Sequence, residues 1–187
     1  MWENLRADAL DWCEGKSWIW RAALLVYLTY AGLRYLTNFH YASIFEGISF
    51  GIHEIGHLLF SPLGRFLMFA GGTITELAAP IAAGFLLLRQ RDYFGISVAG
   101  CWLSYCAFSV ARYMGDARAQ QLPLLGLSDQ PEHDWHYLLS TVGLLNADTA
   151  LAFVTRVVAF AILLASITLG VWLCRNMGKN SPQKHEM

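Results

Sequence analysis

Charged side chains are scarce in this chain. Only 14% of its 187 residues are Asp, Glu, Lys or Arg, and 56% are hydrophobic, whereas a soluble domain usually carries about a quarter charged residues. The charges form neither a basic block nor an acidic tail, and the formal net charge is -1. These absences argue against nucleic acid as a partner and indicate a lipid bilayer as the surroundings of the chain.

Cysteine and histidine are too few for two familiar kinds of site. The four cysteines form no CxxC pair and lack the density of a secreted disulfide scaffold, so we expect them to be small apolar residues within helices. Membrane di-iron enzymes use many histidines in clustered boxes, and this chain has six in total. Two of these, His40 and His185, stand apart from the candidate site described below.

Long apolar runs are the main feature that is present. A membrane-spanning helix needs about 20 mostly apolar residues, and several segments meet or approach this length. The piece 135–145 is too short to cross and predicts a re-entrant or surface helix. We therefore predict an all-α fold, a polytopic membrane helix bundle with about five transmembrane helices, at residues 18–36, 44–61, 66–88, 94–114 and 150–174.

These segments divide the chain into three predicted regions. Residues 1–17 are predicted to be an amphipathic N-terminal lead-in, residues 18–174 a single membrane domain with the candidate site, and residues 175–187 a polar C-terminal tail. We expect an integral, multi-pass protein of the cell inner membrane. Lys and Arg are similarly numerous on both sides of the predicted bundle, so the positive-inside rule assigns no orientation. The oligomeric state is also left open.

The second predicted span contains ionisable residues where apolar ones are expected. Its sequence His53-Glu54-Ile55-Gly56-His57 is an HExxH pattern. At about 100° per residue the two histidines lie one turn apart on one helix face, so both imidazoles can bind one metal ion. The carboxylate of Glu54 lies at the edge of that face, where it can reach a water molecule on the metal.

Within a bilayer, an HExxH pattern without a function is energetically unfavourable. In a soluble protein HExxH often arises by chance on a solvated helix. An ionisable group near the bilayer centre costs about 2.5–3.5 kcal/mol on insertion scales, and four such groups lie within residues 46–57. A bound dication neutralises carboxylates and occupies imidazole lone pairs. We expect Zn²⁺, because it accepts imidazole and carboxylate ligands in a tetrahedral set.

A catalytic zinc site needs a third protein ligand from elsewhere in the chain. Asp116 follows the fourth predicted span, which runs parallel to the second, so both spans end on the same membrane face. His133 lies in the connector that leaves this face, in a polar cluster with Asp134 and His136. Glu76, in the third predicted span, is either a ligand or a group that holds a histidine N–H. Asp116 is the preferred ligand, and His133 and Glu76 are alternates for the third or fourth position.

Several of these features occur together in one known family. An HExxH in an early span, "AGG" at the opening of the next span and an aspartate closing a later span resemble the site-2 protease family of intramembrane zinc metalloproteases, over roughly residues 44–122. The resemblance implies that His53, His57 and Asp116 bind zinc, the last in place of the aspartate of the family's LDG motif. It also implies that Glu54 activates a zinc-bound water. Here a glycine precedes the aspartate, in "MGDARAQ", instead of following it.

The predicted function is hydrolysis of peptide bonds in membrane-embedded peptides or proteins by a zinc metalloprotease. Two alternatives remain open. One is a membrane zinc hydrolase that acts on lipid amides or esters with the same residues. The other is a non-catalytic membrane protein with a structural metal site, which would fill all four positions with protein ligands.

Glycines are frequent in the second and third predicted spans. Because glycine has no side chain, these positions permit close approach of a neighbouring helix or of an extended substrate strand. Helix packing alone is the simpler interpretation. The glycines concerned are Gly47, Gly51, Gly56, Gly71 and Gly72.

Overall fold

The structure is a computed structural model that describes residues 2–38, 40–124 and 132–179. Within these ranges every regular element is a helix and no strand occurs, which confirms the predicted all-α class. Two short 3₁₀ turns, η1 (Ser61–Leu63) and η2 (Leu145–Ala147), lie between α-helices. The α-helices are α1 (Trp2–Cys13), α2 (Ile19–Thr37), α3 (Ile44–Phe60), α4 (Arg65–Arg89), α5 (Tyr93–Gly115), α6 (Asp134–Thr141) and α7 (Asp148–Lys179).

Three helices in the described part of the chain are long and apolar enough to cross a membrane. They are α4, α5 and α7 with its preceding η2 turn, and they coincide with the third, fourth and fifth predicted spans. The first two predicted spans also form helices, α2 and α3, but neither meets the same standard, so the predicted count of five was too high. α3 has only 17 residues, and α2 carries two arginines within its 19 residues, which lower its mean hydropathy.

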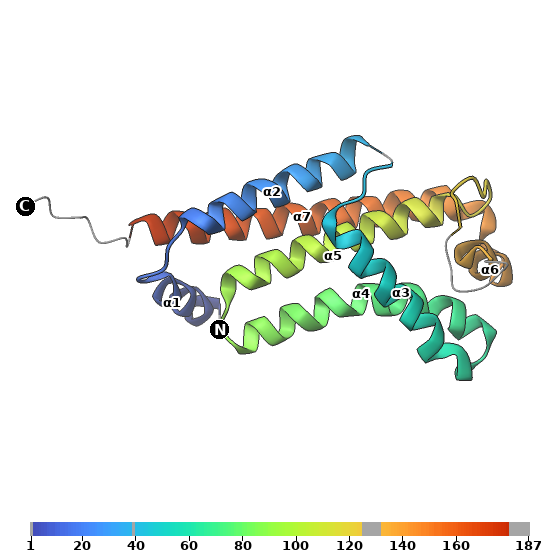
Figure 1. Cartoon of the computed structure of the whole chain (residues 1–187), viewed down its shortest axis with the longest axis horizontal. Helices are drawn as coiled ribbons and strands as arrows, with labels where there is room; N and C mark the ends of the chain where they lie inside the picture. Colours follow the sequence, from blue (N-terminus) through green and yellow to red (C-terminus); the bar gives the residue numbers. More distant parts are fainter. Residues whose placement is uncertain (1, 39, 125–131, 180–187) are drawn as a thin grey trace, which may run out of the picture.

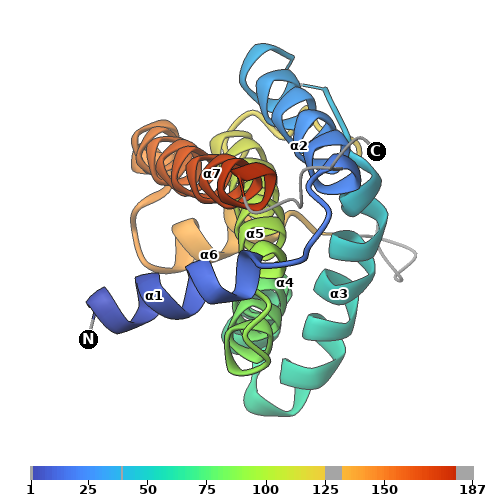
Figure 2. The same ribbon diagram turned by 90° about the vertical axis from the view of Figure 1, so that its left-hand side faces the viewer.

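The main core lies where α5 packs against α2 and α7 (Figures 1 and 2). Leu28 of α2, Tyr105 of α5 and Leu163 of α7 are among its buried side chains. Polar contacts join the same helices, since the Tyr105 hydroxyl donates a hydrogen bond to the Leu28 carbonyl oxygen over 2.6 Å. Ser104 of α5 donates to the Ala159 carbonyl oxygen over 2.8 Å. These buried groups are therefore satisfied without water, as an apolar environment requires.

The helix α1 crosses one end of this bundle. Figure 2 shows it lying across the bundle axis, at the end where the α4–α5 turn and the last turns of α7 are found. Its residues Ala9 and Cys13 are buried against Tyr93 of α5 and Met177 of α7. The first part of the predicted tail belongs to α7, and residues 180–187, including the predicted end of the tail, lie outside the described residues.

A helical hairpin of α3 and α4 packs beside α5. Gly64 has φ of 97°, a left-handed conformation that glycine adopts without strain, and it reverses the chain between η1 and α4. The two helices touch at glycines, because a Cβ on Gly71 would lie only 2.7 Å from the Gly56 carbonyl oxygen. A Cβ on Gly47 or Gly51, by contrast, would meet no atom within 4 Å. Close backbone approach therefore concerns the second half of α3 and the start of α4.

The short helix α6 lies at the opposite end of the bundle from α1, close to the α3–α4 turn (Figure 1). It overlaps the piece 135–145, which was predicted to be too short to cross, and begins one residue before it. His133 caps it, since its Nδ1 accepts the N–H of His136 over 3.2 Å. Leu139 of α6 is buried against Val110 and Met114 of α5. This packing fixes Asp134, the first residue of α6, above α3.

Candidate metal centre

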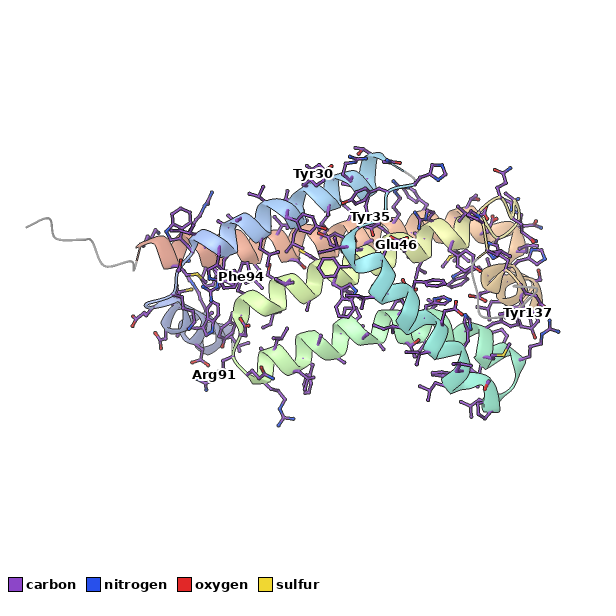
Figure 3. The ribbon with its side chains drawn as sticks, viewed as in Figure 1. Tyr30, Tyr35, Glu46, Arg91, Phe94 and Tyr137 are labelled. Atoms are coloured by element: carbon purple, nitrogen blue, oxygen red, sulfur yellow. The ribbon has the colours of Figure 1, made fainter. Side chains whose placement is uncertain are left out.

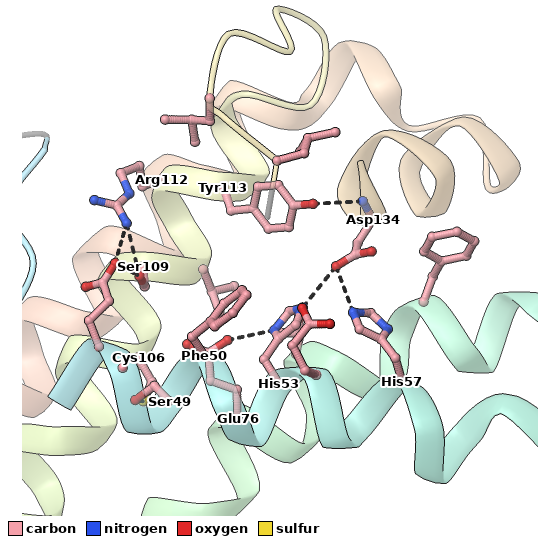
Figure 4. A pocket seen from close by; sticks show the side chains of 18 of the residues that line it. Ser49, Phe50, His53, His57, Glu76, Cys106, Ser109, Arg112, Tyr113 and Asp134 are labelled. Atoms are coloured by element: carbon pink, nitrogen blue, oxygen red, sulfur yellow. Dashed lines mark hydrogen bonds and ion pairs between the residues drawn. The ribbon is translucent and has the colours of Figure 1, made fainter. Parts of the chain in front are cut away.

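A cavity of about 840 Å³ lies between α3, α4, α5 and the first turn of α6. Its wall is mainly apolar and includes Phe50, Phe69 and Val110. His40, which was predicted to stand apart from the site, also lines this cavity. Polar groups gather in its middle, where His53 and His57 of α3 face α6 (Figure 4). A mostly apolar cavity with a few convergent polar groups is the usual form of a binding or active site.

Three side chains converge at this place. His53 Nε2 lies 3.0 Å from Asp134 Oδ2, and His57 Nε2 lies 3.3 Å from the same oxygen. One possible ligand atom from each residue lies within 4.8 Å of the others. Ligand atoms at about 2.0–2.1 Å from a tetrahedral zinc ion are themselves about 3.3 Å apart. The three residues therefore form a cluster that could hold a metal ion.

The Nδ1 atom of each imidazole already has a hydrogen-bond partner. His53 Nδ1 lies 3.0 Å from Glu76 Oε2, and His57 Nδ1 lies 2.8 Å from the Met68 carbonyl oxygen. Both partners are acceptors, so in the neutral imidazoles the hydrogen is on Nδ1 and the lone pair is on Nε2. In that neutral state both lone pairs face the Asp134 carboxylate, and the contact becomes attractive when a shared metal ion or a proton on each imidazole lies between them. Histidines that bind metals are held in this way.

Burial and charge also favour a cation here. The carboxylates of Glu76 and Asp134 are both buried. Burial raises the pKa of Asp134, but its contacts with His53 and His57 outweigh burial, so that the net pKa falls below the usual range and the carboxylate is ionised. Buried negative charge is costly unless it is compensated by a nearby positive charge. A divalent ion between these groups would supply that compensation.

Two further carboxylates of the cavity, Glu46 and Glu132, have cationic partners. Glu46, at one end, accepts a hydrogen bond from Arg112 over 2.6 Å and another from the Tyr35 hydroxyl over 2.8 Å; Figure 3 shows Tyr35 and Glu46 side by side. Glu132 pairs with Arg65 over 2.7 Å at the rim. Among the described residues, the carboxylates nearest the two histidines form no ion pair with Lys or Arg. Positive charge in the middle of the cavity therefore depends on protonated histidines or on a bound cation.

Glu54 of the HExxH pattern faces the same cavity. It is half-buried, and its carboxylate has no hydrogen-bond partner among the described residues, which leaves it open to the space beside the two histidines. This position suits a general base, because the group can reach a water molecule without serving as a ligand itself. Its catalytic role stays a prediction.

The predicted ligands Asp116 and His133 lie next to this cluster but outside it. The Asp116 carboxylate accepts the backbone N–H groups of Gln121 and Leu122, each over 3.0 Å, and so closes the turn after α5. His133 directs its Nε2 towards Asp116, 3.5 Å away. The geometry thus favours Asp134 over Asp116 as the third ligand.

Glu76 was predicted to be either a ligand or a group that holds a histidine N–H. In this geometry its carboxylate contacts the Nδ1 of His53, which corresponds to the second of these roles. The sequence did not predict Asp134 as a member of the candidate cluster. The polar cluster "PEHDWH" did point to this segment, but it gave no reason to prefer the aspartate over the neighbouring histidine. The α6 cap decides between them, because His133 caps the helix while Asp134 lies in its first turn.

Gly72 brings the backbone of α4 against the cluster. A Cβ at this position would collide with His53 Nε2 and would lie 2.7 Å from His57 Nε2. Real Cβ atoms essentially never approach other atoms within 3.0 Å. Both imidazoles can therefore keep their orientation only while this position is glycine.

We expect Gly72→Ala to lower zinc affinity at least about 10-fold. Mutations that disturb the orientation of metal ligands usually lower metal affinity by about 10–100-fold, and this estimate takes the lower end of that range. Alanine displaces both Nε2 atoms, although it favours the helix itself by about 1 kcal/mol. Isothermal titration of the purified protein with zinc measures the effect. Gly84→Ala in the same helix is the control, because its Cβ would meet only the Ala99 Cβ at 3.7 Å. Equal affinity of both variants would contradict a site built on these nitrogens.

Comparison with protein-family models, with curated proteins and with solved structures finds no match for this chain. The resemblance to the site-2 protease family therefore rests on the motifs within residues 44–122. Membership of that family stays a prediction.

Proposed function

We propose that this chain is a zinc-dependent membrane metalloprotease that hydrolyses peptide bonds of membrane-embedded substrates, as in the site-2 protease family that it resembles. One observation carries the proposal. His53, His57 and Asp134 converge within metal-binding distance on the wall of a mainly apolar cavity that Glu54 also faces. In this proposal the protein crosses the membrane several times, with α4, α5 and α7 among its spans.

The number of ligands supports a catalytic site over a structural one. A structural zinc site is closed by four protein ligands, and a catalytic site has three and keeps one position open. The cluster contains three residues within the described part of the chain. Asp116, which could have completed a closed site, is engaged with the turn after α5. His133 uses its Nδ1 in the cap of α6, while its Nε2 faces Asp116 at 3.5 Å and is not among the three clustered ligand atoms.

Each residue of the site has a separate role in the proposed reaction. His53, His57 and Asp134 hold the ion, and Glu76 fixes the orientation of the His53 ring. When bound, zinc lowers the pKa of water towards about 7 and polarises the carbonyl group of the substrate. Glu54 takes the proton of the attacking water and returns it to the leaving amine.

The cavity wall indicates the chemistry of the substrate. It is mainly apolar and lies beside the candidate spans α4 and α5, so it suits an extended apolar segment drawn from the bilayer. An extended chain advances about 3.3 Å per residue, and a cavity of about 840 Å³ accommodates only a few residues at a time. The same wall also admits acyl chains, which makes a lipid amide or ester hydrolase the second candidate.

Metal analysis together with two substrate panels tests this proposal. We expect about one zinc ion per purified chain, cleavage of apolar peptides in detergent or vesicles, no hydrolysis of lipid amides or esters, and loss of cleavage on chelation that added zinc reverses. Elemental analysis and mass spectrometry of the products are the measurements. Protein without stoichiometric metal would refute the site, and cleavage of lipids but not of peptides would establish the second candidate instead.

A further inference from the structure

Tyr113 presents a hydroxyl group to the metal centre that the reaction above does not use. It lies near the end of α5 and lines the same cavity as the two histidines. Its hydroxyl oxygen accepts the backbone N–H of Asp134 over 3.1 Å. Its ring stacks on the His133 imidazole, with the centroids 4.2 Å apart. These two contacts fix both the ring and the hydroxyl (Figure 4).

The contact with Asp134 places this hydroxyl close to the ligand cluster. Four covalent bonds join the amide nitrogen of an aspartate to its carboxylate oxygen, so these atoms lie within about 5 Å of each other. Asp134 thus contacts Tyr113 with its amide and both histidines with its carboxylate. Figure 4 shows the phenol pointing towards Asp134, on the side of the cavity opposite α3.

The hydrogen of this hydroxyl is available to a bound substrate. A phenol has one donor hydrogen, and its oxygen can accept as well. The oxygen is used by the Asp134 amide, whereas the hydrogen has no acceptor among the described residues. The group is therefore a fixed donor that faces the space where a substrate carbonyl would lie.

We propose that Tyr113 is a catalytic residue that donates a hydrogen bond to the oxyanion formed during peptide hydrolysis. This inference rests on the proposed function. Fixed donors aimed at developing charge are usually the largest single contribution to catalysis, because they need no reorganisation during the reaction. The substrate class that this donor serves is a carbonyl compound that passes through a tetrahedral oxyanion, such as a peptide.

The step balances without any further reactant. The oxygen of water forms a bond to the carbonyl carbon, the π-electron pair of the carbonyl moves to its oxygen, and the proton of water passes to Glu54. Tyr113 keeps its own proton and shares it with the oxyanion in a hydrogen bond. When the intermediate collapses, the carbon–nitrogen bond breaks and the nitrogen takes the proton from Glu54. The products are a carboxylic acid and an amine.

Tyr113→Phe tests this role, because it removes only the hydroxyl and keeps the ring on His133. The probes are an apolar peptide that the wild type cleaves and its phosphinic analogue, which imitates the tetrahedral oxyanion. We expect normal zinc content, a fall in kcat of about 100–1000-fold with KM unchanged, and phosphinate binding weakened about 10–100-fold. In a Glu54→Gln background, which should not cleave, the peptide itself should bind equally well with and without the Tyr113 hydroxyl.

Tyr137→Phe is the matched control. Tyr137 belongs to α6 and packs its ring on Phe69, with centroids 4.5 Å apart, but it does not line the cavity. Its variant should match the wild type in zinc content, turnover and phosphinate affinity. Any loss in this control would indicate a general effect of removing a hydroxyl near α6, and would overturn the assignment to Tyr113.

Three results would contradict the inference. Loss of zinc in Tyr113→Phe would show that the hydroxyl only positions Asp134. Equal losses in peptide and phosphinate affinity would show a contact that does not discriminate the oxyanion. Unchanged turnover would show that no such donor is needed. A zinc-loaded wild type that cleaves no peptide contradicts the proposed function itself, which separates the two failures.

Discussion

Glu54→Gln is expected to bind zinc as the wild type does and to lose peptide hydrolysis by about 100–10,000-fold, the usual contribution of general acid–base catalysis. Glutamine has the size and shape of glutamate but cannot take up the proton of the attacking water. The metal site should survive, because the Glu54 carboxylate belongs to none of the hydrogen bonds that orient the two histidines. Steady-state cleavage of a peptide in detergent, with zinc content measured in parallel, gives both quantities.

A second glutamate provides the control for this result. Glu14 is exposed at the α1 end of the bundle, far from the cavity, so Glu14→Gln removes the same charge and should cleave normally. If Glu54→Gln retained full activity, the proton would have to pass through another group, and the HExxH pattern would be only a pair of ligands. If it lost its zinc, Glu54 would be a structural part of the site.

Asp134→Ala is expected to abolish stoichiometric zinc binding, whereas Asp116→Ala should retain it. Losing even a residue that supports a ligand costs about 10–100-fold in metal affinity, and the loss of a ligand should exceed this. Removing the Asp134 carboxylate takes away the only oxygen that both Nε2 atoms approach in the described cluster. Elemental analysis after dialysis, followed by zinc titration, measures the difference.

The comparison separates the two possible third ligands. Asp116→Ala should lower thermal stability, because the amides of Gln121 and Leu122 lose their acceptor, at a cost of about 0.5–1.5 kcal/mol for each hydrogen bond. This loss of thermal stability would serve as an internal control, because it shows that the Asp116 hydrogen bonds were removed while zinc binding was retained. Zinc loss in Asp116→Ala with zinc retained in Asp134→Ala would reverse the assignment and restore the ligand that the family resemblance implies.

Local regularities in the sequence predicted part of this architecture. The positions of His53 and His57 relative to each other follow from the periodicity of one helix, and the helix positions follow from apolar runs bounded by polar turns. Glu76 was recognised as a group that could hold a histidine, because a tight hairpin fixes the register of α3 against α4. Each of these inferences depends on residues that are close in the chain or joined by one turn.

The remaining features depend on packing between distant segments. Asp134 is 81 residues from His53 in the chain, and its place is set by the burial of Leu139 against α5 and by the cap that His133 forms. No periodicity in the sequence contains this information. The number of spans was overestimated for a related reason, because α3 is apolar in composition but ends after 17 residues at the turn that brings α4 back.

The origin of Asp134 on α6 has a thermodynamic consequence. Two of the three proposed ligands belong to the hairpin, and the third belongs to a short helix outside the candidate spans. A bound ion would therefore join one segment to the other. The free energy of zinc binding would then add to the free energy with which α6 docks on the hairpin. Zinc at about 100 times its Kd would stabilise the docked arrangement by about 2.7 kcal/mol. Zinc supply would thereby set how firmly α6 is held against the hairpin.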